Sequence, residues 1–230
     1  QRQMCIRDRA LYYRWSVFIL LSVGLVLLMK HGILTPFVFW SRIQYYTFST
    51  FTLFFLWLGA TLFKADIPYL YTADCRFIVA ASLVTLSVMY HVIVRPGAIK
   101  THRLNDISYE HFSFYNYIFH YFIPVLMVAD YLFFVDKTDL HPYIVVLWMI
   151  YPALYVVFVY WRAWVTIVTK GRSHLYPYTF MDPRTNDFIS ITKGCLKVGF
   201  QFFLIGLAVY AAGAGLWYLG LPPLSWTYNG

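Results

Sequence analysis

The chain has 230 residues, of which 60% are hydrophobic and only 12% are charged, and its mean hydropathy is +0.60. Soluble domains carry about 25% charged residues, so this composition excludes an ordinary soluble domain and indicates a membrane-embedded one. The net charge of +8 is scattered between apolar stretches, which predicts loop charge at an anionic membrane surface and disfavours a nucleic-acid-binding face.

The first nine residues, QRQMCIRDR, are unlike the rest of the chain. They resemble translated sequencing-adapter read-through, so we expect a non-native or disordered start and a first helix that begins near Ala10. Residues 10–230 are expected to form one domain, because no repeat, linker or shift in composition divides them.

Six apolar stretches follow, each close to the length of about 20 residues that a transmembrane helix needs. In chain order they cover residues 12–29, 43–63, 75–94, 112–135, 142–165 and 196–219. Charged or Pro-containing segments separate them, including a Pro36 turn at 30–42, a hydrophilic loop at 95–111 and the longest loop at 172–193. The sequence therefore predicts an all-α polytopic membrane protein, a bundle of six transmembrane helices.

Lys and Arg are concentrated in the loops after the first, third and fifth spans. The positive-inside rule places these three loops in the cytoplasm and both termini on the other side. We therefore expect a multi-pass integral protein of the bacterial inner membrane, with membrane lipids as its partners.

The fourth span is apolar enough to cross a bilayer, yet it carries Asn116 and His120 one helical turn apart, followed by Pro124. An ionisable residue inside a span is by default a candidate functional residue, because it is costly to bury in hydrocarbon. A structural role, in which these side chains form hydrogen bonds with a neighbouring helix, is the competing interpretation.

Antiparallel spans place three reactive side chains at a similar depth. Thr47 lies about one turn inside the second span, His91 about one turn from the end of the third, and His120 about two turns into the fourth. At ~1.5 Å rise per residue, all three lie within roughly 6–12 Å of the same membrane face. A hydroxyl and an imidazole are the parts of a nucleophile–base pair, so the sequence predicts a shared site beside an apolar cavity.

The loop segment Tyr176-Pro177-Tyr178 lies over the same face. We expect these large, rigid residues to pack as a lid over the mouth formed by the second, third and fourth spans. Interfacial anchoring by the two Tyr side chains is the alternative.

Several short motifs recur in a definite order along the chain. They are Tyr46-Thr47-Phe48, Thr85-Leu86, Tyr90-His91, Arg95-Pro96, His120-Tyr121 with Pro124, Tyr151-Pro152 with Tyr155, and YPYTFMD at 176–182. This order resembles the androgen-induced and androgen-dependent TFPI-regulating protein family of integral membrane hydrolases, especially its bacterial six-span "Pr-six-Pr" branch.

The resemblance implies hydrolysis of fatty acid esters of hydroxy fatty acids or similar lipid esters, without cofactor or metal, with Thr47 as nucleophile and His120 in the catalytic pair. A neutral imidazole is suited to take the Thr proton, because its pKa lies near 6.5. Asn116 would orient the ring or donate to the oxyanion, although an interhelical hydrogen bond is its simpler role. The candidates for lining the substrate pocket are His91, Tyr151, Tyr155, Tyr176 and Tyr178.

Other functions stay open at this point. A non-enzymatic membrane scaffold or regulatory protein is the main alternative, and a lipid acyltransferase is the nearest other enzyme, since an acyl-enzyme can pass its acyl group to an alcohol. His91 and His120 could instead be axial ligands of a haem, although the chain has no cysteine haem-attachment motif. A transporter is disfavoured, because we find no internal repeat.

Overall fold

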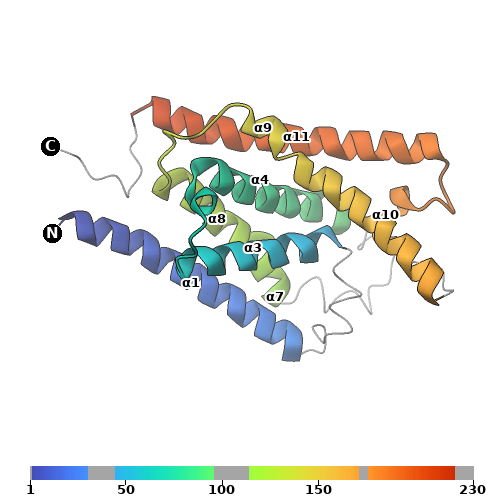
Figure 1. Cartoon of the computed structure of the whole chain (residues 1–230), viewed down its shortest axis with the longest axis horizontal. Coiled ribbons are helices and arrows are strands. Elements are labelled where there is room, and N and C mark those ends of the chain that lie inside the picture. Colours follow the sequence, from blue (N-terminus) through green and yellow to red (C-terminus); the bar gives the residue numbers. More distant parts are fainter. Residues whose placement is uncertain (1, 31–44, 96–113, 171–175, 221–230) are drawn as a thin grey trace.

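The computed structural model describes residues 2–30, 45–95, 114–170 and 176–220, and every regular element within these ranges is helical (Figure 1). The predicted all-α class is therefore confirmed. In chain order the elements are α1 (Arg2–Lys30), α3 (Tyr46–Leu62), the 3₁₀ turn η1 (Pro68–Tyr71), α4 (Ala73–Met89), the π turn η2 (Tyr90–Val94), α7 (Phe114–Tyr117), the π turn η3 (Ile118–Phe122), α8 (Ile123–Phe134), α9 (Ile144–Leu147), α10 (Ile150–Lys170), the 3₁₀ turn η4 (Thr179–Met181) and α11 (Phe188–Tyr218).

Four of the described helical stretches are long and apolar enough to cross a membrane. They are Ala10–Leu27, Ala73–Val92, Ile144–Val168 and Phe188–Tyr218. Two shorter apolar helices, Tyr46–Leu62 and Ile118–Phe134, fall where the second and fourth spans were predicted. The structure thus has the character of a membrane protein with four span-length helices, and the six-span bundle stays a prediction.

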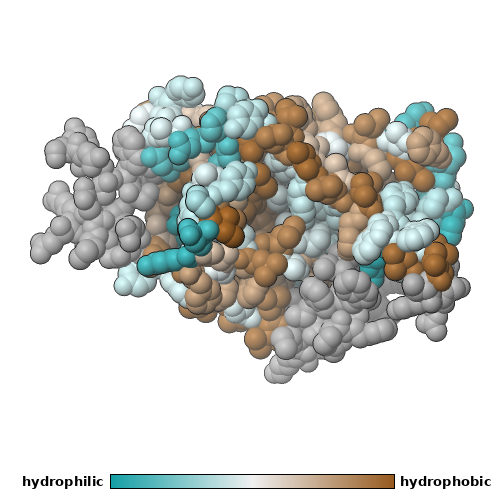
Figure 2. Space-filling view, in the orientation of Figure 1, coloured by the Kyte–Doolittle hydropathy of each residue, from teal (hydrophilic) through white to brown (hydrophobic). Residues whose placement is uncertain are grey.

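The distribution of hydrophobic residues on the surface is also that of a membrane protein. Figure 2 shows hydrophobic residues over much of the middle of one face, with hydrophilic residues gathered toward the two ends. Large apolar side chains are exposed along the helices, among them Leu56 on α3, Val157 on α10 and Leu204 on α11. Such an exposed apolar band is expected where lipid replaces water as the surrounding solvent.

Two helices begin earlier than hydrophobicity suggested. α1 begins at Arg2 rather than near Ala10, because residues 2–9 contain neither Pro nor Gly to stop a helix. α11 begins at Phe188 rather than near residue 196, because the Asp187 side chain caps it by accepting from the Ser190 N–H at 2.9 Å. Apart from Lys30 and Arg95, the predicted turn at 30–42 and loop at 95–111 lie outside the described residues.

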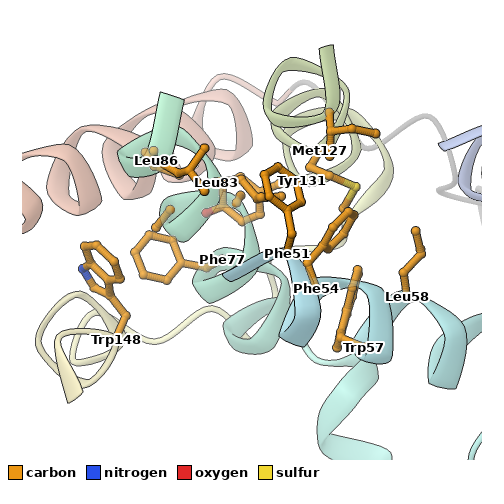
Figure 3. Close-up of a cluster of buried hydrophobic side chains, with 14 of the residues drawn as sticks. Phe51, Phe54, Trp57, Leu58, Phe77, Leu83, Leu86, Met127, Tyr131 and Trp148 are labelled. Atoms are coloured by element: carbon orange, nitrogen blue, oxygen red, sulfur yellow. The ribbon is translucent and has the colours of Figure 1, made fainter. Parts of the chain in front are cut away.

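The core is built around α4, which lies between α8 and α11 (Figure 1). Figure 3 shows large side chains from several helices meeting there. They are Phe51, Phe54, Trp57 and Leu58 of α3, Phe77, Leu83 and Leu86 of α4, Met127 and Tyr131 of α8, and Trp148 between α9 and α10. Because lipid is as apolar as this core, close packing between helices is the main force that holds it together in a bilayer.

Two glycines of α11 let aromatic side chains reach the helix backbone. A Cβ at Gly206 would clash with Trp148 Nε1, and a Cβ at Gly213 would clash with the Tyr131 hydroxyl. Both aromatic side chains are fully buried, so the missing side chains at Gly206 and Gly213 set how closely α11 packs on its neighbours.

An ion cluster connects three helices. Arg14 Nε of α1 donates to Asp130 Oδ1 of α8 at 2.8 Å, and Arg76 Nη1 of α4 donates to Asp130 Oδ2 at 3.1 Å. Asp130 is only 1% exposed and Arg76 only 8%, and the Arg76 guanidinium lies 5.7 Å from the centroid of the Trp57 ring. One carboxylate thus offsets the charge of two Arg side chains that are buried or partly buried.

Lys137 follows α8 and caps its C-terminal end. Its ammonium donates to the backbone carbonyls of Tyr131, Leu132 and Val135 at 2.6, 2.9 and 2.7 Å. Burial lowers the pKa of Lys137 to about 8, so the side chain is still protonated at pH 7 and keeps its three donors. The last carbonyls of a helix have no partner inside the helix, and this one side chain supplies donors to the end of α8.

Replacing Lys137→Met should therefore lower the free energy of unfolding by about 1–3 kcal/mol, because buried carbonyls lose their donors. Denaturant unfolding of the purified protein in detergent measures the change. Lys193→Met is the matched control, since Lys193 is exposed on α11 and its loss should have little effect. Equal unfolding midpoints for the two variants would contradict the capping role.

Candidate functional site

A cavity of about 1210 Å³ lies between α10 and the first half of α11. The two helices diverge toward the end where α11 begins, and η4 lies between them there (Figure 1). Apolar residues form most of the wall; they include Met149, Pro152, Ala153 and Val156 on one side and Ile191, Leu196, Val198 and Phe202 on the other. The volume exceeds the ~300–1,000 Å³ usual for small-molecule pockets, so a long aliphatic chain fits inside.

The third wall comes from α3 and the α4–η2 segment. It contains Thr47, which had been predicted as the nucleophile, together with Tyr46, Leu86 and Tyr90. Tyr155 of α10 and Tyr178 of the long loop complete this part of the wall. The structure therefore brings Thr47 together with two of the predicted pocket tyrosines.

Tyr178 reaches from the long loop into the bundle. Burial raises the pKa of Tyr178 to about 12, while hydrogen bonds with the Tyr46 backbone and the Tyr155 side chain act in the opposite direction. This part of the predicted lid therefore lies against the first turn of α3 and the second turn of α10.

The described loop residues around Tyr178 contact α10 and α11. The Tyr160 hydroxyl donates to the Met181 carbonyl at 2.7 Å, and the Tyr176 ring lies 5.6 Å from the Tyr160 ring. Phe180 lies over Gly194, where an added Cβ would come within 2.9 Å of the Phe180 ring. Tyr176 and Tyr178 thus occupy different places: Tyr176 lies against Tyr160 in the middle of α10, and Tyr178 lines the cavity.

A group of hydroxyls connects α3 to α10 beside the cavity. Thr50 Oγ1 and the Tyr151 hydroxyl are 2.7 Å apart, and Ser49 Oγ lies 3.4 Å from the same hydroxyl. The Tyr46 ring packs against the rings of Tyr151 and Tyr155, with centroids 5.5 and 5.1 Å away. Tyr151 of α10 therefore makes an interhelical contact, and the threonine that it contacts on α3 is Thr50.

His120, Asn116 and Tyr90 form a compact group where η3 meets η2. The His120 ring stacks on the Tyr90 ring with centroids 3.8 Å apart, and Asn116 Nδ2 donates to the Tyr90 hydroxyl. All three side chains are buried. The Asn116 side chain thus makes an interhelical hydrogen bond.

The main chain of Asn116 fixes the His120 ring. His120 Nδ1 lies 3.1 Å from the Asn116 carbonyl oxygen, and because a carbonyl only accepts, Nδ1 must carry the hydrogen. In the neutral ring the lone pair is then on Nε2. This is the tautomer that a general base needs, with one nitrogen held as a donor and the other able to take a proton.

The second predicted histidine is placed differently. His91 is exposed, and its Nδ1 lies 3.0 Å from the Tyr121 hydroxyl, which also accepts from Arg95 Nη1 at 3.5 Å. Both histidines are in π-helical turns, η2 and η3. Such turns are rare and are often found at functional sites.

Tyr90 belongs to both groups, since it lines the cavity with Thr47 and stacks on His120. The rings of Phe51 and Phe119, 4.9 Å apart, pack α3 against η3 beside it. Tyr90 was not predicted as a site residue; in the sequence it stood out only as the neighbour of His91 in the Tyr90-His91 motif.

Within the described residues, no three His, Cys, Asp or Glu side chains are grouped so that they could hold a metal ion. No protein-family model, no curated protein and no solved structure matches the chain. The resemblance to the androgen-induced protein family therefore rests on the order of the motifs and stays a prediction.

Proposed function

We propose that the chain is a six-span integral enzyme of the bacterial inner membrane that hydrolyses lipid esters, such as fatty acid esters of hydroxy fatty acids. Thr47 is the nucleophile and His120 the general base. The observation that carries the proposal is the shared position of Tyr90, which lines the apolar cavity with Thr47 and stacks on His120.

The reaction follows the usual course of a hydroxyl nucleophile. Thr47 Oγ1 attacks the ester carbonyl carbon while His120 Nε2 takes its proton, and the carbonyl electron pair moves to the oxygen. Collapse of this intermediate breaks the bond to the alcohol, which leaves with the proton from His120. Water then attacks the acyl-Thr47 ester in the same way, releasing the fatty acid and restoring the Thr47 hydroxyl.

The state of His120 supports its role as the base. Its Nδ1–H is held by the Asn116 carbonyl, which directs the basic nitrogen away from the helix backbone. The ring is only 8% exposed, so bulk water has little access to the basic nitrogen.

The cavity supports a lipid as the substrate. Its lining is mostly aliphatic and aromatic, and it runs along α10 and α11, two of the helices long and apolar enough to span a membrane. A long acyl chain can lie between these helices with its ester group at Thr47. The motif order shared with the androgen-induced protein family points to the same substrate class.

A fluorophosphonate probe, which reacts with activated hydroxyls by displacement of fluoride, should label the purified protein at Thr47. Peptide mapping by mass spectrometry locates the label, and Thr47→Ala should remove it. Thr52→Val is the matched control, because the Thr52 hydroxyl is bonded to the Phe48 carbonyl of its own helix at 2.7 Å. Undiminished labelling of Thr47→Ala would contradict the proposal, and a Soret absorbance band would favour the haem alternative.

A further inference from the structure

Tyr90 has the contacts expected of a group that takes part in the reaction. Its ring covers one face of His120, with centroids 3.8 Å apart. Its hydroxyl accepts from Asn116 Nδ2, and its side chain lines the cavity that also contains Thr47. The residue is 5% exposed, so its polar end acts in surroundings of low dielectric.

The hydrogen bond from Asn116 sets the polarity of the Tyr90 hydroxyl. A phenol has one hydrogen to donate and can accept at its oxygen. Because the Asn116 amide N–H donates to that oxygen, the Tyr90 hydrogen must be directed to a different acceptor. Accepting a hydrogen bond also polarises the O–H bond and makes it a stronger donor.

The reaction proposed above creates a suitable acceptor. When Thr47 Oγ1 attacks the ester carbonyl carbon, the carbonyl electron pair moves to the oxygen and leaves it negatively charged. Removing one fixed donor to such an oxyanion typically lowers kcat by about 10²–10³-fold, because the site is shielded from water. The wall around Thr47 contains the hydroxyls of Tyr46, Tyr90, Tyr155 and Tyr178. Of these four tyrosines, Tyr90 is the one whose ring stacks on His120.

We infer that Tyr90 is a catalytic residue of this site, and that its hydroxyl, polarised by Asn116, donates a hydrogen bond to the oxyanion formed during ester cleavage. The inference rests on the proposed function of Thr47 and His120. No proton leaves Tyr90; its O–H bond stays intact while the hydrogen bond strengthens as charge develops and weakens when the alcohol departs. The Tyr90 ring thus contacts the base His120, while its hydroxyl would contact the reacting carbonyl oxygen.

Tyr90→Phe removes the hydroxyl and keeps the ring that stacks on His120. We expect kcat for a p-nitrophenyl acyl ester to fall by about 10²–10³-fold with KM nearly unchanged, because the donor acts on the transition state rather than on the bound ester. Tyr121→Phe is the matched control: its ring lies 6.1 Å from the Tyr90 ring and its hydroxyl contacts His91, so its kcat should stay close to wild type.

A second variant tests the polarity independently. Asn116→Asp is nearly the same shape, but the new carboxylate accepts from the Tyr90 hydroxyl instead of donating to it, so kcat should also fall by at least about 10-fold. Gel filtration in detergent and the unfolding midpoint show whether each variant is folded. Wild-type kcat in folded Tyr90→Phe would overturn the inference, as would a loss that appears only in KM.

The outcome for Thr47 separates this inference from the proposal beneath it. If Thr47→Ala loses hydrolysis and fluorophosphonate labelling while Tyr90→Phe keeps wild-type kcat, the hydrolase proposal holds and the role of Tyr90 is wrong. If Thr47→Ala retains both, the hydrolase proposal itself fails.

Discussion

Thr47→Ala and His120→Ala should each lower kcat for ester hydrolysis by about 10⁴–10⁶-fold, and the double variant should be no worse than the weaker single one. A nucleophile and its base act as a unit, so once either is lost the other contributes almost nothing. Hydrolysis of a long-chain ester by the purified protein in detergent, followed as release of fatty acid, measures all three rates.

Thr50→Val is the sharpest control for this experiment, because Thr50 is on the same helix and its hydroxyl contacts Tyr151 at 2.7 Å. Its kcat should stay within a small factor of wild type. Full activity in Thr47→Ala would show that Thr47 is not the nucleophile, whereas no ester hydrolysis by the wild-type protein would favour a scaffold or regulatory protein. Loss of activity in Thr50→Val with retention in Thr47→Ala would instead move the nucleophile one turn along α3.

Asp130→Asn should destabilise the protein by about 3–5 kcal/mol, the largest effect on folding that we expect from a single substitution. The change leaves two Arg side chains, Arg14 and Arg76, without the carboxylate that both contact. Removing one partner of a buried ion pair leaves an uncompensated charge in a region where water does not solvate it. Denaturant unfolding in detergent at pH 7 gives the difference in the free energy of unfolding.

The ion pair of Asp182 and Arg184, in which the Arg184 side chain is exposed, supplies the comparison. These side chains contact each other at 2.6 Å, with Arg184 46% exposed. Asp182→Asn should cost no more than about 1 kcal/mol, as exposed ion pairs contribute little. Similar decreases in the free energy of unfolding for Asp130→Asn and Asp182→Asn would show that burial does not make the Asp130 cluster more important for stability.

Hydrophobic stretches were sufficient to predict where the helices lie, because an apolar run of about 20 residues has the length of a membrane-spanning helix. They were insufficient for the ends of the helices. The beginning of α11 depends on one side-chain hydrogen bond, from the Ser190 N–H to Asp187, and residues 188–195 are too mixed in polarity to be recognised as part of a span.

Residues of the candidate site could be proposed from the sequence only where the residue type itself carries the chemistry. Thr47 and His120 were proposed as a hydroxyl and an imidazole at similar depth. Thr47 lines the cavity, whereas His120 is not among the lining residues and stacks on Tyr90, which does line it. Tyr90 could not be singled out among 21 Tyr residues, since its importance depends on contacts with Asn116 and His120, which are distant in sequence. The ion cluster was missed for the same reason, as Arg14 and Asp130 are 116 positions apart.

The length of α11 has a consequence for how a lipid reaches the cavity. Its 31 residues extend about 46 Å at 1.5 Å per residue, whereas the hydrocarbon layer of a bilayer is about 30 Å thick. With its apolar second half in the hydrocarbon, the first turns of α11, with the exposed Lys193 and Lys197, stand at the level of the lipid headgroups. Lys197 also lines the cavity, so this end of the cavity lies at the same level. On the proposed function, a lipid ester would then enter between α10 and α11 with its acyl chain in the hydrocarbon and its ester near the headgroups, without crossing the centre of the bilayer.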